Sequence, residues 1–405
     1  MNCMKVRMCI TIGLALASSF SAACTHSGRP GVREPVPNST PMERFTVLTY
    51  NMLHGLEVRG WSVRPGESKE EQRTRFNLQA RQLSLAQPDV MLLQEVNPLP
   101  EKAEAFVTAP KTFGLQYTEV HQADACGIRL FGLRIVPGLN NGMAVLAKAP
   151  LRLRKVEGLN LSGGIGGCGD FFGLQFGELR YALIAEVENP GTGNKFLVVS
   201  LHLHSGIERT AYFIQKATEA EEQGRIQRED LQDFVADLKQ DQNRRLDEIR
   251  VLVKELLRLQ AEETYLGVIV GGDFNFEPDS PEYRELLAAG LRDTYMVASP
   301  SNDLYSYDPE QNAIVRQEEV VMPPSLRQAL MHLPESEQQK IVEGYRKGMG
   351  QARRIDFLFH MGKPANKPKE CLRQELFGEP TAVSVQTGSD HYGVLNTYTL
   401  DPSHC

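Results

Sequence analysis

Gly267-Val-Ile-Val-Gly-Gly-Asp-Phe-Asn275 runs from an apolar segment into two glycines, an acid and an amide. A short, nearly all-apolar run is typical of a β-strand covered on both faces. Gly271 and Gly272 allow another group to approach the backbone closely, and Asp273 and Asn275 point the same way on an extended chain. The same residues also suit a tight turn closed by an Asx side chain, so this stretch alone does not establish an active site.

The same pattern, an apolar strand that ends in a polar side chain and a turn, recurs along the chain. Sheets commonly place active-site residues at strand ends, so several such ends predict one shared site. The residues in these positions are Asn51, Glu95, His202, Asp273, Asp356 and Asp390. Further strands are expected at 142–147, 181–187 and 394–400, and apolar residues at helical spacing predict a helix over 73–86.

Two segments have the character of insertions in one domain that spans residues 42–405. Residues 205–243 hold nine acids and five bases, with apolar residues at amphipathic spacing that predict helices continuing to residue 260. Residues 299–350 have few strand signals and are expected to be rich in loops. No internal repeat or interdomain linker is apparent after residue 41.

The acids and histidines at these strand ends suit chemistry at a phosphate. Glu95, supported by Asn51, offers the oxygen ligands that Mg²⁺ prefers. His391, next to Asp390, is a proton carrier or charge partner. The carboxylate of Asp356 lies within an apolar strand and needs a partner, either His391 or one of the arginines that precede it.

A zinc site at His202 and His204 is the weaker alternative, because further histidine ligands are missing nearby.

Taken in order, these motifs resemble the endonuclease/exonuclease/phosphatase superfamily, which includes deoxyribonuclease I-like nucleases and neutral sphingomyelinases. The resemblance covers roughly residues 45–400 and rests on Asn51, Glu95, the strand that ends at His202, GGDFN (271–275), RRIDFLF (353–359) and GSDHYGV (388–394). It implies an α/β fold, a four-layer α/β sandwich of two mixed β-sheets packed face to face with helices outside. It also implies a hydrolase of phosphoric esters that depends on Mg²⁺, with Mn²⁺ as the alternative.

The resemblance also implies a role for each residue. Glu95 with Asn51 forms the metal site, and Asp390 is similar to a second carboxylate beside the metal. Asp273 orients or deprotonates the attacking water, and Asn275 holds a phosphate oxygen. His391, fixed by Asp356, stabilises the phosphoryl charge or protonates the leaving group, and His202 contacts the scissile phosphate. The sequence departs from the family pattern at Leu201, where threonine is usual, and at His204.

The amino terminus predicts export. Lys5 and Arg7 precede an apolar run and a small-residue stretch that ends at Cys24, as in a signal peptide over 1–23. Cleavage before Cys24 would give a membrane-anchored lipoprotein, whereas ordinary cleavage after Ala23 would give a periplasmic or extracellular protein. Residues 24–41 are rich in Pro, Gly and Ser and are expected to form a flexible tether.

Four cysteines remain once the signal peptide and Cys24 are set aside, which permits two disulfides in an exported protein. Of the three pairings that four cysteines allow, we favour 126–168 with 371–405.

Charge bears on the choice of substrate. The formal net charge is −7, and loss of the signal peptide would make it more negative by two, which disfavours a polyanion such as nucleic acid. Together with export and with Tyr305–Ile314, which looks like a segment of bacterial sphingomyelinases and also suits a plain surface turn, this favours a phospholipid or sphingolipid headgroup. The alternative is a secreted or periplasmic nuclease. A non-catalytic binding relative is disfavoured, because every charged position of the motifs is present.

Overall fold

The computed structural model describes residues 44–59, 62–109, 114–125, 128–130, 133–134, 140–168, 173–262, 265–298, 304–315, 322–362, 371–379 and 387–399. The expected signal peptide and tether, together with Cys24, Cys126 and Cys405, lie outside these ranges. Among the helices in the described ranges, none is both long enough and apolar enough to cross a bilayer.

The first sheet is mixed and has six strands. In spatial order these are β15 (Cys371–Phe377), β16 (Gly393–Thr399), β1 (Arg44–Asn51), β4 (Val90–Val96), β8 (Asn141–Lys148) and β5 (Tyr117–Ala125). β1 and β4 run parallel, and the other neighbours run antiparallel. The parallel pair places the ends of β1 and β4 at the same edge of the sheet.

The second sheet is also mixed and has eight strands. Its order is β13 (Arg292–Asp293), β14 (Asp356–Gly362), β12 (Gly267–Asp273), β11 (Asn194–His202), β10 (Gly173–Asn189), β6 (Ile128–Leu130) and β7 (Leu133–Arg134), with β9 (Arg152–Cys168) paired along β10. β11 and β12 are parallel, so His202 and Asp273 lie side by side at their ends. A separate hairpin joins β2 (Leu56–Arg59) to β3 (Ser62–Pro65).

The two sheets pack face to face. Side chains alternate along a strand, so each central strand of the second sheet contributes to two different cores. Val198, Ile269 and Leu358 point inward and belong to the core built on β1, β4 and β8. Their neighbours Val199 and Val270 point outward, into the core that contains the helices of the second sheet.

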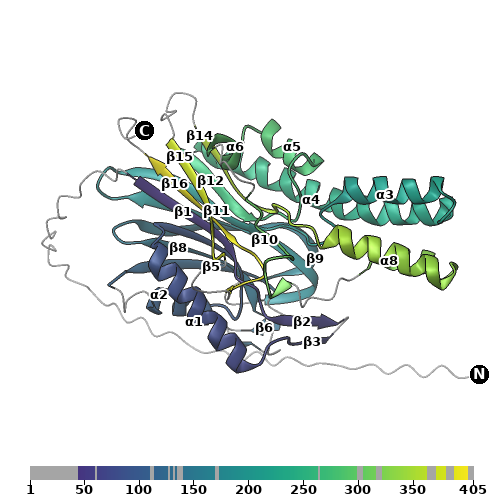
Figure 1. Ribbon diagram of the computed structural model, residues 1–405. Helices are drawn as coiled ribbons and strands as arrows, with labels where there is room; N and C mark the ends of the chain where they lie inside the picture. Colours follow the sequence, from purple (N-terminus) through teal and green to yellow (C-terminus); the bar gives the residue numbers. More distant parts are fainter. Residues whose placement is uncertain are drawn as a thin grey trace, which may run out of the picture. The chain divides into compact units, whose positions relative to one another are not determined.

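Helices cover both outer faces (Figure 1). α1 (Lys69–Ala86) and α2 (Glu101–Thr108) cover the first sheet, and Leu83 and Phe106 join its core. The second half of α4 (Arg228–Glu262) and α5 (Pro281–Ala288) cover the second sheet, with Leu252 and Leu286 buried against it. A short helix, α6 (Thr294–Ala298), follows β13. The predicted four-layer α/β sandwich is therefore confirmed.

A third core lies in the two insertions. α3 (Thr210–Glu222) and the first part of α4 pack with α7 (Pro324–Leu330) and α8 (Glu335–Met349) around a set of apolar side chains. These include Phe213, Phe234, Leu238, Leu326 and Tyr345. Residues 299–350, expected to be rich in loops, thus contain two helices. Leu326 and Tyr345 are buried in a core that α3 and α4, distant in the sequence, complete, which explains the weak local signal.

At Gly271 and Gly272, β12 lies very close to the neighbouring chain segments. A Cβ on Gly271 would lie 2.7 Å from side-chain atoms of Leu358 and of Leu92, which comes from the opposite sheet. A Cβ on Gly272 would collide with the carbonyl oxygen of Leu201 on β11. The two glycines are therefore needed for close approach, both between the sheets and within the second sheet.

Gly272→Ala is expected to lower the free energy of unfolding by about 1–3 kcal/mol, because the added methyl group must displace main chain in a packed sheet. The matched control is Gly344→Ala in α8, where a Cβ meets nothing within 4 Å. Alanine there should stabilise the protein by roughly 0.5–1 kcal/mol through helix propensity. Urea unfolding measures both changes, and a Gly272→Ala protein as stable as the parent would contradict the close approach.

Candidate active site

The strand ends singled out in the sequence come together at one edge of the sandwich. β11, β12 and β14 are neighbours, and their register aligns His202 with Asp273 and Asp273 with Asp356. From the first sheet, β1 ends at Asn51, beside the segment of β4 that carries Glu95. The two sheets thus deliver acids, an amide and histidines to a common, largely buried pocket.

Asn51 connects the two sheets. Its Nδ2 donates to Glu95 Oε1 at 3.2 Å and to Asp273 Oδ2 at 3.1 Å, so one amide group bridges a carboxylate from each sheet. Its Oδ1 accepts from the Leu53 N–H at 3.1 Å. The oxygen therefore points away from the two acids, and it would face a cation between them only after the amide turned over.

A β-bulge aims Glu95 into the pocket. The register of β4 against β8 shifts between Leu93 and Val96, and Glu95 adopts a left-handed φ of 55°. Its Oε2 accepts the His54 N–H at 2.8 Å. Burial raises the pKa of Glu95, but the charge of His54 and this hydrogen bond outweigh it and hold the pKa below its ordinary value.

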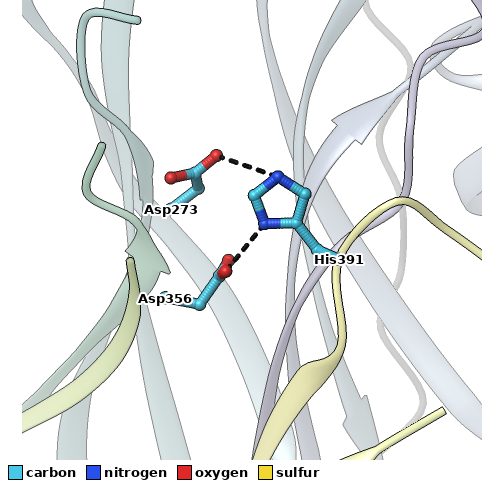
Figure 2. A group of neighbouring side chains, drawn as sticks. All are labelled: Asp273, Asp356 and His391. Carbon is cyan, nitrogen blue, oxygen red and sulfur yellow. Dashed lines mark hydrogen bonds and ion pairs between the residues drawn. The ribbon is translucent and has the colours of Figure 1, made fainter. Parts of the chain in front are cut away.

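Asp273, His391 and Asp356 form a connected group (Figure 2). His391 Nδ1 lies 2.7 Å from Asp356 Oδ2, and its Nε2 lies 3.7 Å from Asp273 Oδ2. Burial by itself would lower the pKa of His391, but the Asp356 and Asp273 carboxylates raise it well above 6.5. Burial, with the Asp356 charge nearby, raises the pKa of Asp273 to about 8. The pocket therefore holds an imidazolium between two acids.

His202 and His204 have separate surroundings. His202 is buried, with Nε2 3.5 Å from Asp273 Oδ2 and Nδ1 3.9 Å from Glu95 Oε1. Burial and the Arg180 charge lower the pKa of His202 to about 3, so it is a neutral imidazole. His204 instead bonds Glu178 and Asp241. The two histidines therefore do not share one site.

Asp390 and Asn275 occupy the margins of the group. Asp390 is buried, accepts the Ser389 hydroxyl at 2.9 Å and interacts electrostatically with Glu95. Asn275 has a left-handed φ of 52°. Its N–H donates to Asp273 Oδ1 at 3.0 Å and its Nδ2 to the Leu203 carbonyl at 3.1 Å. One amide hydrogen of Asn275 thus braces the strand ends, which leaves the other for a ligand.

The donor set fits a hard divalent cation. Four buried or nearly buried carboxylates share the pocket, and mutual repulsion contributes to the raised pKa of Asp273; they are Glu95, Asp273, Asp356 and Asp390. Ligand atoms of Asp273, Asp356 and His391 lie within 4.8 Å of one another. His391 Nδ1 and Asp356 already share a short hydrogen bond, so the acids on the Glu95 side of the pocket are the ones that could hold a cation.

Several residues that support the site were not predicted from the sequence. Ser306 Oγ accepts the Ile355 and Asp356 N–H groups at 3.1 and 2.9 Å, which fixes the start of β14. Asn312 Nδ2 donates to the Ser389 carbonyl at 2.9 Å, beside His391. Both lie in the Tyr305–Ile314 stretch, whose Asp-Pro turn was the available signal, although nothing in it indicated contact with the catalytic segments.

A disulfide at Cys168 is confirmed, whereas both predicted pairings stay predictions. Cys168, at the end of β9, is disulfide-bonded, while its expected partner Cys126 lies outside the described residues.

Comparison with known proteins agrees with this geometry. The model of the Endonuclease/Exonuclease/phosphatase family matches residues 48–391. A family protein from Bacteroides thetaiotaomicron is similar in structure at 15% identity and a TM-score of 0.52, covering 89% of this chain and 96% of that one. Truncated TDP2 from Caenorhabditis elegans is similar at 15% identity and a TM-score of 0.50, covering 88% and 97%. At these identities the structures establish the fold alone. A search of curated proteins finds no match.

Asp356→Asn should lower the pKa of His391 towards its ordinary value, because a charged partner 2.7 Å away is lost. The raised folded-state pKa means that the pair stabilises the fold fully below about pH 6.5 and less as pH rises through the raised value. The variant should therefore lose most stability at low pH. NMR titration of the metal-free protein and urea unfolding from about pH 5 to about pH 9 measure both effects.

Glu119→Gln is the control, because it breaks a histidine–carboxylate pair with His121 on β5. It should leave the pKa of His391 unchanged. An unchanged His391 pKa in Asp356→Asn would contradict the assigned partnership.

Proposed function

Since the chain belongs to the endonuclease/exonuclease/phosphatase family, whose members hydrolyse phosphoester bonds, we propose that it is a divalent-metal-dependent phosphodiesterase. The observation that carries the proposal is the position of Asp273. Its carboxylate lies 3.1 Å from Asn51 Nδ2, 3.5 Å from His202 and 3.7 Å from His391. The candidate base Asp273 thus lies beside the candidate proton donor His391, and Asn51 links it to Glu95, the carboxylate proposed for a metal.

The metal position would be held by Glu95 and Asp390, with Asn51 contributing its oxygen once the amide turns. A bound Mg²⁺, or Mn²⁺ as the alternative, supplies Lewis-acid neutralisation of the charge that develops on the phosphate. Both ions take oxygen ligands, which matches the acids and the amide present here.

The protein's own groups divide the proton chemistry between them. Asp273 accepts the proton of the attacking water, so it must first be ionised. His391 is charged, and its Nε2 faces Asp273 across the pocket, where it stabilises phosphate charge or protonates the leaving oxygen. Asp356 keeps His391 charged and correctly oriented. His202 is neutral and offers a hydrogen bond to a phosphate oxygen without adding charge.

We favour a phospholipid or sphingolipid headgroup over nucleic acid as the substrate. A polyanion needs available cations beside the site. The arginines around this pocket are already paired with carboxylates: Arg75 with Glu67, Arg180 with Glu178, Arg353 with Glu208 and Arg354 with Asp293. The net charge of −7 supports the same choice. A nuclease is the alternative class.

Export is part of the proposal and rests on the amino-terminal sequence, with lipid attachment at Cys24 as one of two outcomes. Fractionation of cells that produce the full chain or its Cys24→Ser variant tests it, and retention of the full chain in the cytoplasm would refute it.

Glu95→Gln, Asp273→Asn and His391→Gln should each lower kcat by roughly 10²–10⁴-fold, because each removes a metal ligand or a proton-transfer group. The measurement is hydrolysis of bis-p-nitrophenyl phosphate after chelation and return of Mg²⁺. Matched controls are Glu70→Gln and His332→Gln, which change exposed residues and should retain parental rates. Full activity of folded Glu95→Gln or His391→Gln protein would refute the mechanism.

The substrate class is tested with a panel of sphingomyelin, phosphatidylcholine, DNA, RNA and bis-p-nitrophenyl phosphate, each with Mg²⁺. We expect a choline phospholipid to be hydrolysed at a higher kcat/KM than either nucleic acid. The reverse order would favour the nuclease. If the folded parental protein hydrolyses none of these substrates, the enzymatic assignment itself is contradicted.

A further inference from the structure

A cavity of about 980 Å³ lies between the two insertions, next to the candidate active site. Its walls come from the turn after β11 (205–208), one face of α4, the segment 304–315, and α7 and α8. Resting on the function proposed above, we propose that this cavity binds a positively charged organic group carried by the phosphodiester substrate. The substrate class would then be phosphodiesters of a cationic alcohol.

The cavity shares a wall with the catalytic group. Tyr307 lines the cavity, and its ring lies edge-on to His391 with a centroid separation of 5.2 Å. The chain that leaves β11 at His202 enters the cavity wall at Ser205. A phosphate held between His202 and His391 would therefore have one ester substituent directed at this cavity.

The α4 wall is acidic. Asp233, Asp237 and Asp241 are spaced four residues apart, so they line one face of the helix. Asp241 is hydrogen-bonded to His204. Asp233 and Asp237 have no cationic partner among the residues that the structure describes. Their charge is available to a ligand.

The bases that line the cavity are already engaged. Arg353 is buried, lies 3.4 Å from Glu208 and stacks over Tyr307 at 4.2 Å. Arg327 donates from Nε to the Met322 carbonyl. Arg353 offsets Glu208, whereas Arg327 keeps its charge because a carbonyl is neutral. The lining holds four acids, Glu208, Asp233, Asp237 and Asp241, against these two arginines, so its formal charge is negative.

Apolar side chains complete the cavity. Val315, Met322 and Met349 line it together with Tyr307 and Tyr345. Carboxylates set among apolar and aromatic groups suit an alkylammonium ion, which presents hydrocarbon surface and one diffuse charge. The same wall repels the next phosphate of a nucleic acid strand.

The test compares two p-nitrophenyl phosphodiesters of nearly equal size. One carries choline, and the other carries 3,3-dimethylbutanol, in which carbon replaces the charged nitrogen. We expect the parent to hydrolyse the choline ester with a kcat/KM about tenfold higher. In the Asp233→Asn/Asp237→Asn double variant this preference should fall to about twofold or less, while the rate on the 3,3-dimethylbutyl ester is unchanged.

Glu229→Gln/Asp247→Asn is the matched control. It removes the same number of charges from exposed positions of α4 that do not line the cavity, and it should keep the parental preference. Equal kcat/KM values for the two esters in the parent, or a preference that survives in the double variant, would overturn the proposal. Hydrolysis of both esters with no preference leaves the phosphodiesterase assignment standing.

If the parent hydrolyses neither ester, the phosphodiesterase assignment fails. The cavity proposal is then tested separately by measuring ligand binding. Calorimetry with phosphocholine and 3,3-dimethylbutyl phosphate should then show tighter binding of the cation, lost in the double variant; equal binding would overturn the proposal. A lipid source and a soluble source of the cation are distinguished by comparing phosphatidylcholine vesicles with glycerophosphocholine. Faster hydrolysis of the vesicles identifies a headgroup at a membrane surface, and the reverse identifies a soluble ester.

Discussion

The two hydrogen bonds from Asn51 Nδ2 to Glu95 and Asp273 are the constraint on which the site depends. The bond to Glu95 lies within the first sheet at 3.2 Å, and the bond to Asp273 crosses to the second sheet at 3.1 Å. Such a bridge is possible only where the sheets approach closely, and Gly271 provides that approach. Nearby, Gln94 and Ser200 make a second polar link between the sheets at 2.9 Å. The geometry of the site therefore depends directly on the close packing of the two sheets.

Burial of several acids in one pocket determines their protonation. Carboxylates removed from water are costly when charged and unpaired, and the protein responds in two ways. His391 becomes a cation between Asp356 and Asp273. Glu95 stays ionised through His54, whereas the pKa of Asp273 rises to about 8. A divalent cation would relieve the remaining repulsion, which supports the metal dependence that we propose.

The sequence predicted the central strands and the residues at their ends because both signals are local. An apolar run as long as a β-strand that ends at Asp273 or Glu95 can be recognised in the sequence without tertiary information. Other features depend on partners distant in the chain. β9 has 17 residues and several glycines, and it forms a strand because β10 runs alongside it. The bulge that turns Glu95 inwards and the hydrogen bonds of Ser306 likewise arise only from register and packing.

The insertions explain how one sandwich can serve different substrates. The sandwich supplies the acids, the amide and His202, whose positions follow from strand register. The insertions add a separate core around Phe213 and Tyr345, and they contact His391 through Tyr307. Changes of sequence in α4 or α8 would therefore alter what surrounds the phosphate without moving Asp273 or His391. In this chain the surrounding wall is acidic. The proposed substrate preference therefore depends on the insertions, whereas the proposed reaction depends on the sandwich.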